Sequence, residues 1–216
     1  MSNRFKRVII IKTPGVAKGG TLLFTFKPLD RIGLKQKKVA WKVIPFAANA
    51  KKRAQVEYVN QLAFIAPQVS DGNRINPSTY EAVNVGDAVS YDLDGDGQLV
   101  INEADDLKRP DFITARNNTR KIQDIAIGLQ PKPRKDPEPI LYFPKVGNTT
   151  MVVAKYHPIL RAYMTSDYQE SEVISGEIQT GLMWERDLSQ LPDTSSWILT
   201  YDDDSGMYNL APDDDN

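Results

Sequence analysis

The feature that most constrains the fold is an alternation of apolar and polar residues with a period of two. It is clear in RVIIIKT (7–13), TLLFTFKP (21–28) and KKVAWKVIPF (37–46). Successive side chains of a β-strand point to opposite faces, so this period predicts strands with one buried face. Fourteen Pro and thirteen Gly separate such segments at short intervals, as many short strands require. The pattern therefore predicts an all-β protein.

Residues 54–66, AQVEYVNQLAFIA, extend this pattern. Five side chains fall on one face of a strand, with only Asn60 interrupting them: Val56, Tyr58, Leu62, Phe64 and Ala66. A helix that begins near Asn49 is the alternative, because several alanines in this region favour helix.

Further alternating segments bring the expected total to about ten strands. They recur at the spacing of roughly eight to twelve residues that is typical of sandwiches and barrels. The last one, SSWILTYDDDSGMYNLAP (195–212), contains two runs around a glycine-bearing turn and predicts a hairpin. The predicted fold is thus an antiparallel β-sandwich, or a barrel-like relative.

Domain organisation depends on a proline-rich segment, QPKPRKDPEP (130–139), which holds four prolines in ten residues. Such a segment is extended and is excluded from a central strand. It is either a linker between two β-units or a crossover within one. The residues after 139 alone would make a small β-unit without disulfides. We therefore predict one domain over 1–210 with a crossover at 130–139. An acidic, disordered tail is expected at 211–216.

The chain has no cysteine, which excludes disulfides, thiolate metal sites and cysteine nucleophiles. Only four consecutive apolar residues, Val8 to Ile11, follow the basic start, too few for a signal-peptide core. No apolar run approaches the ~18 residues of a membrane-spanning helix. We therefore expect a cytoplasmic protein, or one exported without a conventional signal peptide.

The net charge of −1 conceals a strong asymmetry. Residues 1–60 contain fourteen Lys or Arg against two acidic residues, whereas residues 61–216 contain thirteen basic against twenty-six acidic. Such a division is typical of a surface that binds nucleic acid or anionic membrane. The alternative, which we favour, is that basic and acidic strands neutralise each other across the folded surface, because the basic residues alternate with apolar ones.

The most specific short motif lies in YDLDGDGQLVINEADDLKRP (91–110). Counted from the first aspartate, oxygen ligands fall at positions one, three, five, seven and twelve, with Gly97 at six: Asp92, Asp94, Asp96, the carbonyl of Gln98, and Glu103. This spacing resembles the EF-hand loop and its dockerin relatives over these twelve residues. The resemblance implies a Ca²⁺ site, and glutamate at position twelve favours Ca²⁺ over Mg²⁺. The alternative is a solvated acidic turn.

Two departures from an EF-hand change the interpretation of this loop. The residues before it alternate like a strand, and only the exit, up to Pro110, looks helical; no second loop accompanies it. We therefore predict a strand, the loop and a short helix, with Ca²⁺ acting as a structural clamp and not as a sensor.

No catalytic motif stands out. His157 is the only histidine, which excludes any mechanism that needs two, and it is expected to be a packing or surface residue. Trp41, Trp184 and Trp197 each lie in an alternating segment, which favours core packing over stacking on a sugar or base.

The sequence supports three functional hypotheses. The preferred one is a calcium-binding, non-catalytic β-sandwich that binds a glycan or a lipid headgroup, as lectin-like or lytic proteins do. One alternative is a hydrolase built from scattered carboxylates with a calcium-stabilised loop. The other is a nucleic-acid binder that uses residues 1–60.

Overall fold

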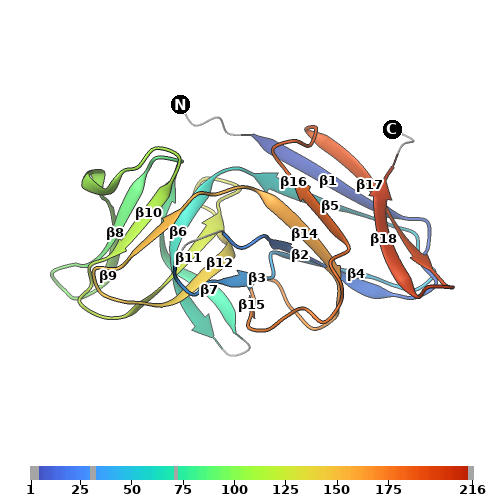
Figure 1. Cartoon of the computed structure of the whole chain (residues 1–216), viewed down its shortest axis with the longest axis horizontal. Coiled ribbons are helices and arrows are strands. Elements are labelled where there is room, and N and C mark those ends of the chain that lie inside the picture. Colours follow the sequence, from blue (N-terminus) through green and yellow to red (C-terminus); the bar gives the residue numbers. More distant parts are fainter. Residues whose placement is uncertain (1–4, 30–32, 71–72, 214–216) are drawn as a thin grey trace.

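The computed structural model describes residues 5–29, 33–70 and 73–213. These residues form an elongated all-β molecule of four sheets, mostly antiparallel, none of which closes into a barrel (Figure 1). The only helical element among them is a single 3₁₀ turn, η1 (Asp105–Leu107). No helix in the described ranges is long and apolar enough to cross a membrane.

Two four-stranded sheets build the half of the molecule that contains the first and last described strands, β1 and β18 (Figure 1). The terminal sheet has the order β18-β17-β1-β5, with β1 and β17 parallel. Its strands are β1 (Lys6–Thr13), β5 (Lys52–Val59), β17 (Thr194–Asp202) and β18 (Met207–Pro212). The inner sheet has the antiparallel order β16-β14-β2-β4. Its strands are β2 (Gly20–Phe26), β4 (Lys42–Phe46), β14 (Ile159–Met164) and β16 (Trp184–Asp187).

The other half contains a six-stranded sheet and a small outer sheet. The six-stranded sheet has the order β15-β3-β12-β11-β6-β7. Its strands are β3 (Lys37–Val39), β6 (Leu62–Ser70), β7 (Arg74–Val83), β11 (Gln123–Leu129), β12 (Glu138–Val146) and β15 (Val173–Ile174). The outer sheet has the order β13-β10-β8-β9, with β8 and β10 parallel. Its strands are β8 (Ala88–Leu93), β9 (Leu99–Glu103), β10 (Ile113–Asn117) and β13 (Met151–Ala154).

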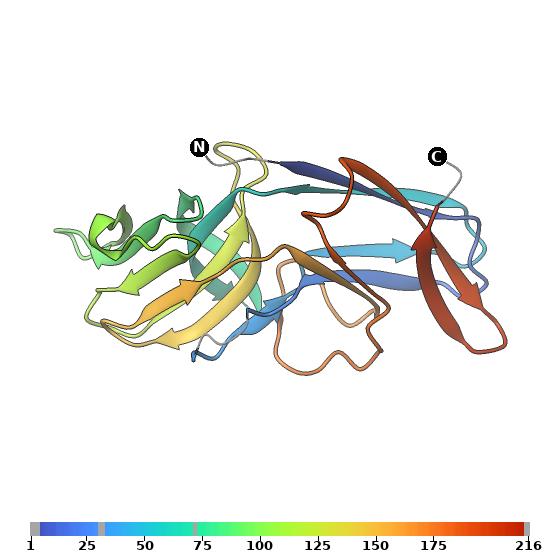
Figure 2. The same ribbon diagram turned by 45° about the horizontal axis from the view of Figure 1, so that its top comes forward.

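The terminal sheet and the six-stranded sheet are linked by one nearly continuous run of chain, β5 followed by β6 (Figure 2). The break falls at Asn60 and Gln61, where the sequence pattern also breaks. Gln61 is buried, and its Nε2 donates to the carbonyl oxygens of Leu62 (3.1 Å) and Val83 (3.0 Å). The strand prediction for this segment is confirmed, and the alternative helix near Asn49 does not form, because residues 52–59 pair with β1.

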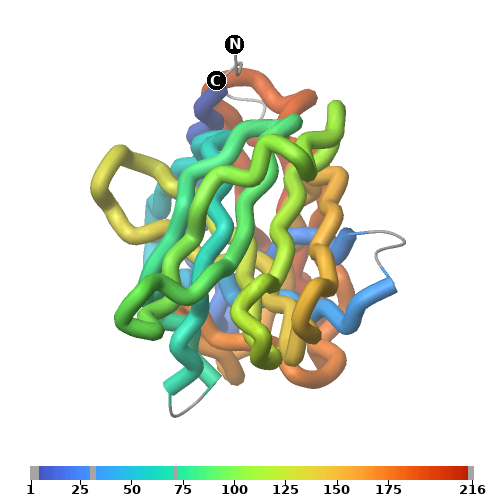
Figure 3. Tube along the Cα trace, turned by 90° about the vertical axis from the view of Figure 1, so that its left-hand side faces the viewer, coloured from blue at the N-terminus to red at the C-terminus, as the bar shows by residue number. Residues whose placement is uncertain are grey.

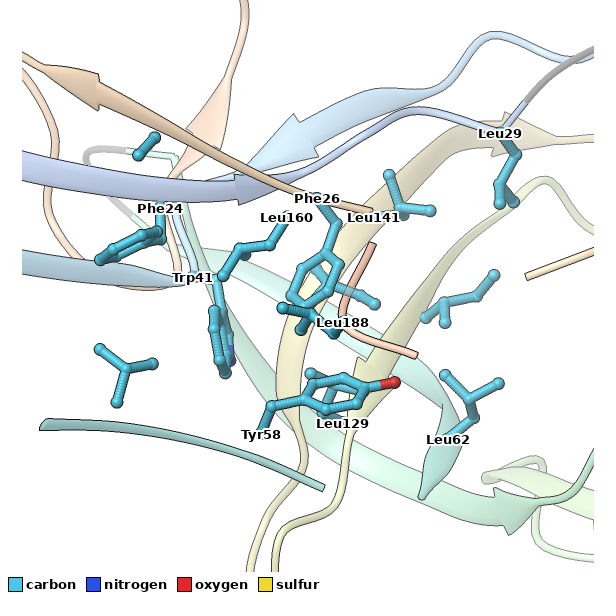
Figure 4. Close-up of a cluster of buried hydrophobic side chains, with 14 of the residues drawn as sticks. Phe24, Phe26, Leu29, Trp41, Tyr58, Leu62, Leu129, Leu141, Leu160 and Leu188 are labelled. Atoms are coloured by element: carbon cyan, nitrogen blue, oxygen red, sulfur yellow. The ribbon is translucent and has the colours of Figure 1, made fainter. Parts of the chain in front are cut away.

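One hydrophobic cluster reaches all four sheets. Near its centre, the ring of Phe26 lies 5.1 Å from Trp41, 6.0 Å from Tyr58 and 6.2 Å from Tyr156, between ring centroids (Figure 4). Trp184 of the inner sheet and Trp197 of the terminal sheet meet edge to face at 5.1 Å. All three tryptophans are buried, which supports the packing interpretation of these residues.

Three features differ from the expected organisation around the loops. The predicted helix after the acidic loop is wrong: residues 99–103 pair with β8 as β9, and only the 3₁₀ turn follows. The proline-rich segment does not cross between sheets, because it joins β11 to β12, which are antiparallel neighbours. It forms a projecting hairpin loop, drawn in yellow in Figure 3. Its prolines lack the N–H groups that strand pairing within the loop would need. They nevertheless do not prevent β12 from beginning at Glu138.

The C-terminal hairpin of β17 and β18 is confirmed, and it extends into the segment expected to be a tail. Residues 211 and 212 pair with β17, and the amide of Asp213 donates to the carbonyl oxygen of Ser196 at 2.9 Å. The apolar side chain of Ala211 and the ion pair between Asp213 and Lys12 at 2.6 Å explain why the chain stays ordered as far as residue 213. Residues 214–216 of the expected tail lie outside the described residues.

A close backbone approach at Gly128 in β11 generates a test of the packing. A Cβ atom placed there would lie 2.5 Å from Cδ1 of Ile65 and 2.9 Å from the carbonyl oxygen of Glu138. Gly128→Ala should therefore lower the free energy of unfolding by about 1–3 kcal/mol, measured by urea denaturation. Gly95→Ala is the control, since a Cβ there meets nothing within 4 Å. Equal stability of the two variants would contradict the β11 packing.

Candidate functional site

The acidic segment forms the hairpin between β8 and β9. Asp94 stabilises its tip, because its Oδ1 accepts hydrogen bonds from the amides of Asp96 (3.0 Å) and Gln98 (2.8 Å). Gly97 adopts φ +77°, a left-handed conformation that glycine accepts without strain. The turn is thus held by its own carboxylate and backbone.

The hairpin does not gather the predicted calcium ligands around one point. Asp92 pairs with Val100, and its Oδ2 accepts from Nδ2 of Asn102 at 3.2 Å. Glu103 pairs with Val89 instead, so strand alternation places its side chain on the opposite face from Asp92. No group of three or more metal-ligating side chains converges within the described ranges. The residues as arranged do not fit a twelve-residue loop, and calcium binding stays a prediction.

The calcium hypothesis makes a specific demand on this hairpin. Glu103 can share a cation with Asp92 only when the end of β9 separates from β8. Calcium should then raise the unfolding temperature of the native chain but not of Glu103→Gln, and it should accelerate amide hydrogen exchange at residues 102–103. Asp124→Asn, which removes a carboxylate outside the hairpin, is the control. Equal unfolding temperatures in calcium and in chelator would contradict the hypothesis.

A different feature is a pocket beside the break between β5 and β6, which we call the junction pocket. Its volume is about 610 Å³, within the range of small-molecule sites. Five connections in the chain meet there: the start of β1, the β5–β6 break, the β7–β8 turn, the β13–β14 connection and the segment after β16. The lining residues are Phe5, Tyr58, Asn60, Leu62, Val83, Asn84, Val85, Asp87, Tyr156, Pro158 and Ser189.

Two tyrosines, Tyr58 and Tyr156, contribute to the lining of the junction pocket. The hydroxyl oxygens of Tyr58 and Tyr156 are buried and contact each other, but neither makes a hydrogen bond of good geometry with any described residue. Figure 4 shows the Tyr58 hydroxyl pointing away from Trp41, on the side of Leu62. Buried polar groups are nearly always satisfied by protein or water, so this pair marks a position where another oxygen or nitrogen atom belongs.

The rim on the Phe5 side is held by Arg7. Its guanidinium lies 4.5 Å from the centroid of the Phe5 ring and donates to the carbonyl oxygen of Leu188 at 3.0 Å and to the carboxylate of Asp193 at 2.8 Å. Asp187 accepts hydrogen bonds from both the amide (2.9 Å) and the hydroxyl (2.7 Å) of Ser189. These contacts fix the segment after β16 against the start of β1.

The opposite rim is the tight β7–β8 turn. Oδ2 of Asp87 accepts from the backbone amide (2.7 Å) and from Nδ2 (3.1 Å) of Asn84. Gly86 takes φ +99°, which lets the turn close. The side-chain amide of Asn84 and the carboxylate of Asp87 are therefore held at a defined position beside Val85.

The charge asymmetry of the sequence is partly neutralised in the fold. Among the described residues, three ion pairs join residues 1–60 to the acidic remainder: Arg7 with Asp193 (2.8 Å), Lys12 with Asp213 (2.6 Å) and Lys42 with Glu138 (3.0 Å). These contacts favour mutual neutralisation over a free basic surface. His157 is exposed and does not line the junction pocket.

No protein-family model, curated protein or solved structure matches this chain. The junction pocket was not predicted from the sequence. Alternation had singled out Tyr58 and the break at Asn60, but no local signal connects them to Tyr156 or Ser189, about a hundred residues or more away.

Buried phenols also determine how the protein responds to alkali. Burial raises the pKa of Tyr58, Tyr91 and Tyr156 above the ordinary tyrosine value of about 10. Below about pH 10 the folded and unfolded chains both keep these protons, so this contribution to stability is fully present. As the pH rises further, the unfolded chain ionises first, and the free energy of unfolding should fall.

Denaturant unfolding followed on either side of about pH 10 measures this effect. The loss of stability on the alkaline side should be smaller in Tyr91→Phe, which lacks one of the three phenols. An alkaline stability loss of the same size in this variant would contradict a buried, protonated Tyr91.

Proposed function

We propose that this chain is a non-catalytic binding protein that takes a saccharide unit of a glycan in the junction pocket. The observation that carries the proposal is the pair of buried tyrosine hydroxyls that, among the described residues, have only each other as an imperfect partner, in the lining of a cavity that also presents aromatic, amide, hydroxyl and carboxylate groups. The predicted sandwich-type packing of the sheets is part of this proposal. It provides a rigid scaffold from which connecting segments form the site.

The chemistry of the lining suits a neutral, hydroxyl-rich ligand. Sugar hydroxyls both donate and accept, as do the side chains of Asn60, Asn84 and Ser189. The ring of Phe5 offers an apolar surface for the C–H face of a sugar. Among the described lining residues Asp87 is the only charged one, and the Arg7 guanidinium at the rim is already paired with Asp193, so the described lining offers an anionic lipid headgroup no unpaired cation. This favours the glycan over the lipid headgroup as occupant of this pocket.

The tyrosine pair supplies recognition within this lining. Burial and the neighbouring Tyr58 hydroxyl raise the pKa of Tyr156, so its phenol stays protonated and serves as a donor. The Tyr156 residue is only half-buried, and a modest movement of its ring opens its hydroxyl to a ligand oxygen or a bridging water. The hydrolase and nucleic-acid hypotheses stay predictions, as no contact among the described residues favours them.

Replacement of Tyr156 by phenylalanine tests the proposal. Screening on a glycan array identifies a ligand, and calorimetry then compares the native chain with the variant. Loss of one hydrogen bond in a buried site should weaken binding by about tenfold. Thermal stability should change little, because among the described residues the removed hydroxyl makes only an imperfect contact with the Tyr58 hydroxyl.

Tyr91→Phe is the matched control. The Tyr91 hydroxyl donates to the carbonyl oxygen of Ile65 at 2.8 Å in the core, so its removal should cost about 1–2 kcal/mol of stability and leave glycan affinity unchanged. Absence of any glycan ligand, or equal affinity of native chain and Tyr156→Phe, would contradict the proposed function.

A further inference from the structure

The connection between β13 and β14 separates the junction pocket from a second cavity. Residues along this extended segment alternate: Tyr156 and Pro158 line the junction pocket, whereas Lys155 and His157 line the other side. The second cavity, which we call the lysine pocket, has a volume of about 340 Å³. It is lined by Lys27, Pro28, Leu29, Phe112, Val153, Lys155, His157 and Ile159.

The lysine pocket differs from the junction pocket in its charge. Lys27, Lys155 and His157 are its polar side chains, and none of the residues in its described lining is acidic. Basic residues elsewhere in the chain, among them Lys6, Lys12 and Lys108, have carboxylate partners, and they serve as a comparison for Lys155 and His157. Neither Lys155 nor His157 has an ion-pair partner in the part of the chain that the structure describes.

The floor of the lysine pocket is apolar and fixed in place. Leu29 is buried, and Gln36 binds both of its backbone groups: Nε2 donates to the carbonyl oxygen, and Oε1 accepts from the amide at 2.9 Å. The amide of Lys27 donates to the carbonyl oxygen of Ile159 at 2.9 Å, which holds β2 beside β14. The cavity therefore combines cationic groups at its rim with an apolar floor.

We propose that the lysine pocket binds the phosphate group of an organic phosphate monoester, with the adjoining part of the ligand against Leu29 and Phe112. A phosphate monoester carries a charge of about −1.5 to −2 near neutral pH. It can therefore interact with several basic side chains at once, more favourably than a ligand that carries a single carboxylate. Lysine binds phosphate as a point charge. The residues are distinct from those of the junction pocket, so this site and the proposed glycan site can fail separately.

Binding of three probes tests the site and identifies the source of the phosphate. The probes are inorganic phosphate, glycerol phosphate, and phosphatidylcholine vesicles with or without phosphatidate, all at low salt. Glycerol phosphate or the phosphatidate vesicles should bind, and binding should weaken about tenfold or more in Lys155→Gln/His157→Gln. Glycan binding by this variant should persist, which shows that the β13–β14 connection is intact.

Lys51→Gln/Lys121→Gln is the control, because it removes two exposed lysines outside the cavity. Binding of vesicles alone would assign the site to a lipid headgroup, and binding of glycerol phosphate would assign it to a soluble ester. No binding of any probe, binding of inorganic phosphate alone, or an equal loss in both double variants would overturn the proposal.

Discussion

The passage of the chain from β5 to β6 is the constraint on which the rest of the structure depends. A single run of residues belongs to two sheets. At the break, the side-chain amide of Gln61 donates to the carbonyl oxygens of Leu62 and Val83, which pair with each other where the six-stranded sheet begins. The side chain before the break, Tyr58, reaches into the common core, and the side chain after it, Leu62, does the same. Sheet order and pocket position both follow from this junction.

Packing at the junction is nearly complete, and the exceptions are informative. Phe5 and Phe26 pack against the ring of Tyr58, so the apolar part of this side chain is well packed, whereas its hydroxyl lacks a hydrogen bond of good geometry. The same holds for Tyr156 on the neighbouring connection. Leaving such groups unpaired costs on the order of 1–3 kcal/mol each, and an external hydrogen-bond partner in the pocket would offset that cost. The free energy that these hydroxyls would gain from a ligand therefore links the fold to the proposed binding role.

Much of the fold follows from local pattern. Alternation identified strands such as β5, where Val56 and Tyr58 are buried and Glu57 between them is exposed, because burial of one face imposes the period directly. It also identified β1 and β2, although consecutive residues of these strands are buried on both faces. It missed most of β7, whose polar, proline-containing sequence suits an edge strand. It also misassigned β9, where a motif typical of a calcium loop suggested a helix. There the ladder to β8 overrides the local signal.

The site was less predictable for a related physical reason. The junction pocket is formed by side chains brought together from Phe5 to Ser189, and each is unremarkable within its own segment. Tyr156 and His157 are neighbours in sequence yet face different cavities, a division that only the position of the β13–β14 connection reveals. Local chemistry suggested a site in the acidic hairpin, whereas the tertiary arrangement places two of the buried hydroxyls that lack good hydrogen bonds, those of Tyr58 and Tyr156, in the lining of the junction pocket.

The central claim is that the paired tyrosine hydroxyls contact the ligand. Labelling the tyrosine ζ-carbons with ¹³C and titrating the saccharide identified by array screening measures this directly by NMR. The account predicts that the Tyr58 and Tyr156 resonances shift on saturation while that of Tyr91, bonded to the Ile65 carbonyl, stays in place. Saturable binding that leaves both Tyr58 and Tyr156 unshifted would contradict it.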